Sequence, residues 1–227
     1  MDGSVKKNRF FLFRIRVHYS WVLALLLITL AVSTQFSFVS FSLTYRVILG
    51  IVAGIDFFFI VLIREVVPGL IAWYKGISVE SITLFAFGGL IRTDQENSTP
   101  ADDLLLAISG ILCNIAIFGI LLVVSILLAD SANVSAQVLS KWLAFFCFMM
   151  ILLHFVPAFP LDAGRILRAM IWKSLGNVRK ATQIAGWIGW AIGIIFVIGG
   201  ILLSVRTAEL FTGILLMAVG LILQNAA

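Results

Sequence analysis

The sequence is poor in charged residues. Asp, Glu, Lys and Arg make up 12% of the 227 residues, whereas hydrophobic residues make up 62% and the mean hydropathy is +1.13. A soluble domain has about a quarter of its residues charged, so the composition excludes an ordinary soluble domain and predicts an integral membrane protein. The net charge of +5 comes from basic residues in short loops between apolar runs. It therefore predicts contact with membrane lipid and no nucleic-acid partner.

The chain also has few cysteines and histidines, two of each. Cys113 and Cys147 both lie inside apolar segments, and neither has a second Cys or a His at the spacing of metal ligands. This excludes a cysteine-based metal site and predicts two buried apolar thiols.

Long apolar runs are what the sequence has in abundance, and they predict the fold class. We expect an all-α polytopic membrane protein with six transmembrane helices, a short β hairpin after the second helix and a broken fourth helix. The chain forms one membrane domain over residues 1–227, which begins with a basic interfacial arm over residues 1–18. The predicted spans cover roughly residues 19–41, 46–74, 104–128, 142–172, 183–204 and 208–225.

Basic residues are distributed unevenly between the two sides of such a bundle. With the N-terminus inside, the outer segments hold only Arg46, Lys141 and Arg206. The inner segments hold Lys6, Lys7, Arg9, Arg14, Arg16, Lys75, Arg92, Arg165, Arg168, Lys173, Arg179 and Lys180. This bias predicts a multi-pass protein with both termini in the cytoplasm.

The fourth predicted span contains Pro157 and Pro160, which do not fit a continuous helix. Irregular backbone at membrane depth is tolerated only where protein buries it or a cavity wets it. We therefore expect the break between His154 and Arg165 to line a cavity.

The second predicted span carries Arg64 and Glu65 in an apolar helix, and Pro68 follows one turn later. A helical zinc protease has the sequence His-Glu-x-x-His at this spacing, with two imidazoles on one face of the helix and the Glu as general base. This chain keeps Glu65 and has Arg64 and Pro68 at the two His positions.

Ionisable groups within spans are rare and are usually paired or functional. In this chain they are Asp56, Arg64, Glu65, His154 and Asp162. One interpretation is a functional site between the second and fourth spans. The other is a structural salt bridge of Arg64 with Asp162 or Glu65, in which the guanidinium replaces a buried metal cation.

With the segments around Glu65 and Asp162 considered together, the chain resembles the site-2 protease family of intramembrane zinc metalloproteases. The resemblance covers nearly the whole chain and is most specific in the segment from Pro157 to Arg165. The other similar segments are Arg14 to Trp21, Ile82 to Gly89, and Ser109-Gly110 with Asn114.

The resemblance implies roles for individual residues. Glu65 stands at the position of the general base and Asp162 at that of the third zinc ligand, while Arg64 and Pro68 stand where the family has its two zinc-binding His. His154 stands where the family commonly has an Asn that helps to hold substrate. Gly88, Gly89 and Asn114 are implied as further substrate-binding positions. The family uses zinc, and the loss of both His implies weak zinc binding or none in this chain.

Three functional hypotheses follow. The favoured one is a catalytically inactive homologue that binds transmembrane helices of substrate or client proteins. The second is an active intramembrane metalloprotease with a rearranged site, in which Glu65 is the base and Asp162 and His154 hold the metal. The third is a small transporter or channel with a polar path through Asp56, Arg64, Glu65 and Asp162.

Overall fold

A computed structural model of the chain describes residues 14–35, 41–77, 79–85, 88–93, 99–207 and 210–226. The larger part of the predicted basic arm, residues 1–13, lies outside the described residues. The helices are α1 (Ser20–Gln35), α2 (Leu43–Tyr74), α3 (Pro100–Leu127), α4 (Val134–His154), α5 (Asp162–Leu175), α6 (Val178–Thr207) and α7 (Leu210–Ala226). The strands are β1 (Arg14–Val17), β2 (Val79–Phe85) and β3 (Gly88–Thr93).

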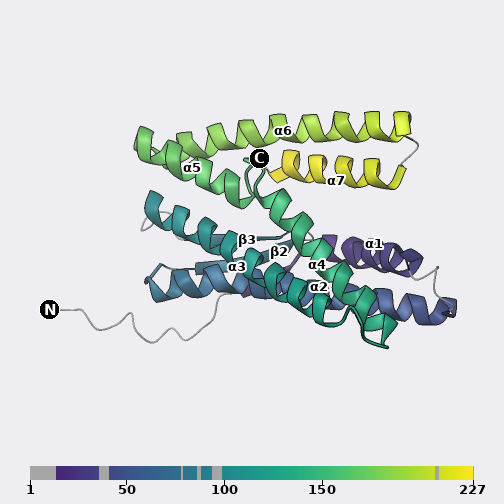
Figure 1. Cartoon of the computed structure of the whole chain (residues 1–227). Helices are drawn as coiled ribbons and strands as arrows, with labels where there is room; N and C mark the ends of the chain where they lie inside the picture. The colour runs from purple at the N-terminus through teal and green to yellow at the C-terminus, as the bar shows by residue number, and fades with distance from the viewer. Residues whose placement is uncertain are drawn as a thin grey trace.

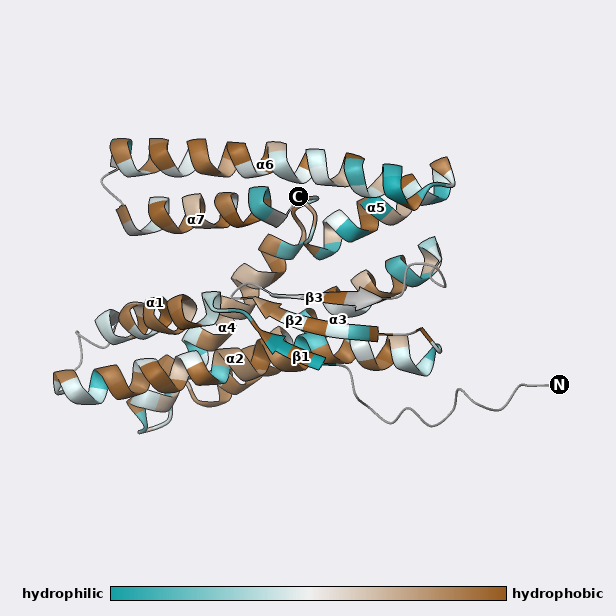
Figure 2. Cartoon of the chain, turned by 180° about the vertical axis from the view of Figure 1, so that it is seen from behind, coloured by the Kyte–Doolittle hydropathy of each residue, from teal (hydrophilic) through white to brown (hydrophobic). Residues whose placement is uncertain are grey.

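Within the described ranges, four helices are long and apolar enough to cross a membrane: α2, α3, α4 and α6. The apolar helices α1 and α7 are shorter than these four. The structure thus bears out a mostly helical protein with several long apolar helices, and the predicted number of six spans stays a prediction. Apolar residues cover most of α1, α2, α6 and α7, while hydrophilic residues gather on β1, on α5 and near the start of α6 (Figure 2).

The predicted break in the fourth span is present, because residues 142–172 belong to two helices. α4 ends at His154 and α5 begins at Asp162, with Pro157 and Pro160 in the connection. A proline has no backbone N–H and clashes with the preceding turn of a helix, which accounts for the break. α5 is amphipathic and has only 14 residues, too few to cross a membrane.

The predicted hairpin is present and belongs to a three-stranded sheet of order β1-β2-β3. β2 and β3 are antiparallel, with Ile82 opposite Ile91, and β1 joins β2 in parallel, with Ile15 opposite Ile82. Ile82 and Leu84 are fully buried, so one face of the sheet packs on the helices.

The main core lies between α1, α2, α4 and this sheet. Trp21 and Val32 of α1 pack there with Phe57 and Val61 of α2 and with Met150 of α4. This packing fixes the middle of α2, and Arg64 and Glu65 lie directly after it, one turn beyond Val61.

α6 and α7 form a separate antiparallel pair at one side of the molecule (Figure 1). Their backbones approach closely at glycines, since a Cβ on Gly200 would lie 2.6 Å from the carbonyl oxygen of Gly213, and one on Gly220 would lie 2.6 Å from that of Gly193. Such close packing of small residues is typical of membrane helices.

Candidate active site

Four ionisable side chains meet in the interior. Arg64 and Glu65 come from α2, His154 is the last residue of α4, and Asp162 is the first residue of α5. They are 2%, 3%, 3% and 5% exposed, respectively. Three helices and the break between α4 and α5 thus bring together four groups that are costly to bury alone.

The guanidinium of Arg64 is the centre of this cluster. Its Nη1 donates to Glu65 Oε1, and its Nη2 donates to Asp162 Oδ2. Both carboxylates are therefore paired with one cation, in an environment that water does not reach. The Nε of Arg64 is buried and, among the described residues, has no hydrogen-bond partner.

His154 completes the cluster through its Nδ1, which lies 3.1 Å from Arg64 Nη2 and 3.4 Å from Asp162 Oδ2. A guanidinium only donates hydrogen bonds, so Nδ1 is the acceptor. The ring proton of a neutral His154 is therefore on Nε2, and Nδ1 faces the guanidinium with its lone pair.

Glycines from two further elements pack directly on these groups. A Cβ on Gly89 of β3 would lie 2.6 Å from Cγ and Cδ of Glu65, and one on Gly110 of α3 would lie 3.1 Å from Asp162 Oδ2. Gly88 has a φ of 143°, a conformation that favours glycine, and its Cβ would lie 3.1 Å from His154 Cε1. The hairpin and α3 thus close over the charged groups because these positions have no side chain.

The chain reaches this arrangement through the irregular segment after α4. The N–H of Leu161 donates to the carbonyl of Ala158 at 2.8 Å, and the N–H of Arg165 donates to Leu161 at 2.9 Å. This turn starts α5 at Asp162, whose carboxylate then lies at a helix N-terminus, where the dipole favours negative charge.

The predicted site residues do not all join the cluster. Gly88 and Gly89 do, whereas the role of Gly110 was not foreseen from the sequence, where it appeared only as part of a small-residue pattern. Asn114 is buried one turn beyond Gly110, and its Nδ2 has no partner among the described residues. Pro68 is buried within α2, which continues through it.

A zinc ion does not fit the residues that are present. Glu65, His154 and Asp162 do meet, but each of them contacts the Arg64 guanidinium, which carries a permanent positive charge and cannot act as a ligand. Pro68 offers no side-chain donor. No group of three or more His, Cys, Asp and Glu in the described part of the chain is arranged to hold a metal ion.

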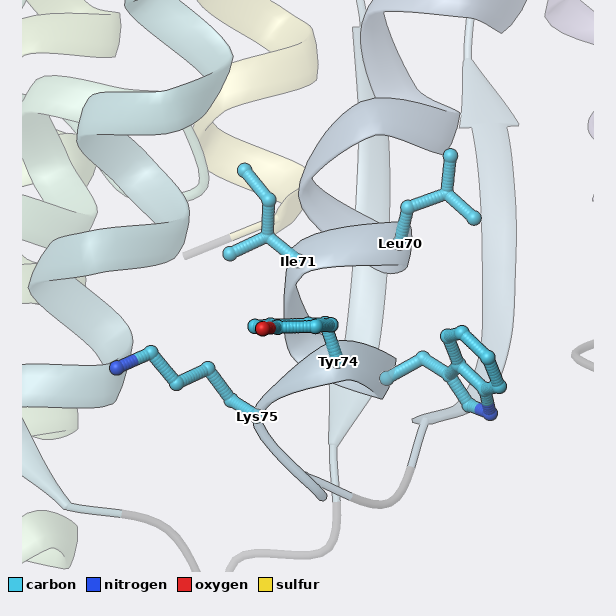
Figure 3. Close-up of a pocket in the computed structure, with 5 residues that line it drawn as sticks. Leu70, Ile71, Tyr74 and Lys75 are labelled. Carbon is cyan, nitrogen blue, oxygen red and sulfur yellow. The ribbon is translucent and has the colours of Figure 1, made fainter.

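A surface hollow of about 340 Å³ lies at the C-terminal end of α2 (Figure 3), and none of its lining residues belongs to the cluster. Its lining residues are Leu70, Ile71, Trp73, Tyr74 and Lys75. Aromatic and basic residues at the end of an apolar helix are typical of a membrane–water interface, so the lining of this hollow does not by itself indicate a binding site.

No family model matches the chain, but individual proteins and a solved structure are similar to it. The protein sll0528 of Synechocystis sp., which carries the name of a zinc metalloprotease, is 31% identical over 201 residues, covering 85% of this chain and 52% of the relative. Zinc metalloprotease MJ0392 of Methanocaldococcus jannaschii is 29% identical over 203 residues, covering 89% of this chain and 55% of the relative. The chain thus spans about half the length of these relatives.

The fold is also similar to a solved structure. The site-2 protease from Methanocaldococcus jannaschii superposes with a TM-score of 0.70 at 28% sequence identity, covering 93% of this chain and 88% of that one. Taken with the sequence relatives, this similarity shows that the chain is a homologue of the site-2 protease family of zinc metalloproteases.

Proposed function

We propose that this protein is a catalytically inactive homologue of the intramembrane site-2 proteases, which binds transmembrane segments of client proteins without cleaving them. The observation that carries the proposal is the position of the Arg64 guanidinium. It is hydrogen-bonded to Glu65, to Asp162 and to His154, the groups that a rearranged zinc site would need.

The charges of the cluster support this proposal. Two buried carboxylates require a nearby cation, because an unpaired buried charge is very unfavourable. In the family a zinc ion supplies it, whereas in this chain Arg64 supplies a cation that belongs to the protein. The carboxylates therefore share a cation that does not depend on bound metal, and the polar groups of the site remain together.

The surroundings of the cluster support client binding rather than a loss of the whole site. The hairpin β2–β3 packs against Glu65 and His154 through Gly88 and Gly89, so the elements around the site keep close contact with it. A protein that had lost every function of this site would have no need for charges at this depth, since apolar residues of similar volume are often as stable.

The first test is the zinc content of the detergent-purified protein by elemental mass spectrometry. We expect no zinc in the parent and about one zinc per chain in the Arg64→His/Pro68→His double variant, in which the two imidazoles join Asp162. Pro68→His alone is the matched control and should remain empty, because one imidazole and one carboxylate are too few ligands. Stoichiometric zinc in the parent would overturn the proposal and favour the rearranged active site.

The second test uses the same preparations and a transmembrane helical peptide with a photo-reactive side chain, reconstituted in lipid vesicles. The parent should cross-link to the peptide and release no fragments. Cleavage by the parent would refute inactivity, and a complete absence of cross-linking would refute client binding.

A further inference from the structure

A second buried group of charges lies beside the cluster, and nothing in the sequence pattern singled it out. Asp103 is in the first turn of α3 and is 7% exposed. It accepts hydrogen bonds from Arg168 of α5, at 2.9 Å from Nε and 2.7 Å from Nη2. Nη2 of Arg165 lies 3.5 Å from the same carboxylate. A bidentate Arg–carboxylate pair of this kind fixes orientation as well as distance.

Arg168 also contacts the segment that leads into α5. Its Cζ lies 5.2 Å from the centre of the Phe159 ring, within the range of a cation–π interaction. Arg168 therefore holds the start of α3 on one side and the break between α4 and α5 on the other. Along the chain, Asp162 lies between Phe159 and Arg168.

Arg168 adds an attachment farther along α5, whose start has no side-chain cap. The residue before it, Leu161, makes no side-chain capping hydrogen bond. Farther along α3, Gly110 lies against Asp162. The seven residues from Asp103 to Gly110 span about 10 Å of helix, and the six from Asp162 to Arg168 span about 9 Å. The two helices therefore lie antiparallel and touch at two points, the Asp103–Arg168 pair and the Gly110–Asp162 contact.

We propose that Asp103 is a positioning residue for Asp162: through its bidentate pair with Arg168 it sets where α5 begins relative to α3, and so places the Asp162 carboxylate at Arg64. Exposed ion pairs contribute little, but this pair is largely buried. Removing one partner leaves the other charge uncompensated and releases the helix that it held. The inference concerns the position of Asp162 and holds whether or not the proposed function is correct.

The test measures the distance between α3 and α5 by disulfide formation. The reporter is Gly110→Cys/Asp162→Cys in a background in which Cys113 and Cys147 are replaced by Ala, so that only the engineered thiols react. Gly110 and Asp162 are in contact, so a disulfide should form readily under mild oxidation. Adding Asp103→Asn should slow cross-linking roughly tenfold or more.

Several variants distinguish an effect on the position of Asp162 from an overall loss of fold stability. Asp103→Glu keeps the carboxylate and should recover most of the cross-linking rate, and Arg168→Gln should behave like Asp103→Asn. Lys173→Gln, which removes an exposed cation from the same helix, should leave the rate unchanged. A second reporter, Gly199→Cys/Leu216→Cys between α6 and α7, where a Cβ on Gly199 would make ordinary contact with Leu216 at 3.6 Å, should cross-link equally fast with and without Asp103→Asn.

An unchanged rate at the first reporter in both Asp103→Asn and Arg168→Gln would overturn the inference. An equal loss at both reporters would also overturn it, because the pair would then stabilise the fold in general and not the place of Asp162. The disulfide measurement depends neither on client binding nor on zinc content. Its result therefore stands even if the tests of the proposed function fail.

Discussion

Replacement of Arg64 by Ala is the change that the structure predicts to be most damaging. The substitution removes the only cation that contacts Glu65 and Asp162 among the described residues, and it removes the donor to His154 Nδ1. Both carboxylates remain buried, because the backbones of Gly89 and Gly110 still cover them. They must then either stay charged without the guanidinium or take up protons.

The expected loss of stability follows from these contacts. Removing one partner of a buried ion pair costs about 3–5 kcal/mol. For a domain of this length, each kcal/mol lowers the melting temperature by about 2–4 °C. Arg64→Ala should therefore lower the melting temperature by roughly 6–20 °C.

Cys147 provides a natural reporter for this measurement. It is fully buried, whereas Cys113 is half-buried, so in a Cys113→Ala background a thiol-reactive fluorescent dye reports unfolding of the core. Arg179→Ala, at an exposed arginine near the start of α6, is the matched control and should leave the melting temperature unchanged.

The charge argument has its own control. The triple variant Arg64→Met/Glu65→Gln/Asp162→Asn removes the cation and both anions together, so it should recover most of the stability that Arg64→Ala loses. If Arg64→Ala melted within about 2 °C of the parent, which corresponds to less than about 1 kcal/mol, the ion cluster would not stabilise the fold as described.

Two smaller predictions concern α3. Gly110→Ala should destabilise the protein by about 1–3 kcal/mol, because its Cβ would lie 3.1 Å from Asp162 Oδ2. Gly119→Ala is the control on the same helix: no atom lies within 4 Å of its Cβ, so it should be neutral or stabilise the protein by up to about 1 kcal/mol. Thermal unfolding of the two variants tests this, and equal effects would contradict it. Thr99→Ala removes the capping box with Asp102 and should cost about 1 kcal/mol, measured as faster amide hydrogen exchange in the first turn of α3 with the remaining helices unchanged.

Much of the fold follows from local patterns in the sequence. Hydropathy predicts the long helices, because an apolar run of about 20 residues is long enough to span a membrane and is unfavourable in water. The two prolines after His154 end α4, and the change to alternating residues after Tyr74 gives the hairpin β2–β3. These features depend on neighbouring residues only, so they can be read without knowing what packs against them.

The site was predictable only in part. The sequence left open whether Arg64 pairs with Glu65 or with Asp162, and the structure contains both pairings. Glu65 is adjacent in the chain, but Asp162 reaches the guanidinium only because α5 starts against α3. The functional meaning of these contacts, an inactive client-binding site, stays a proposal.

The amino-acid sequence by itself determined that the chain is a membrane protein with a broken helix and buried charges, because composition, periodicity and proline act locally. Only the tertiary structure decided that one guanidinium contacts both carboxylates and His154, that Gly110 makes room for Asp162, and that Asp103 pairs with Arg168. These contacts join residues that are far apart along the chain. Their geometry depends on how the helices pack against one another, and no local pattern of residues specifies that packing.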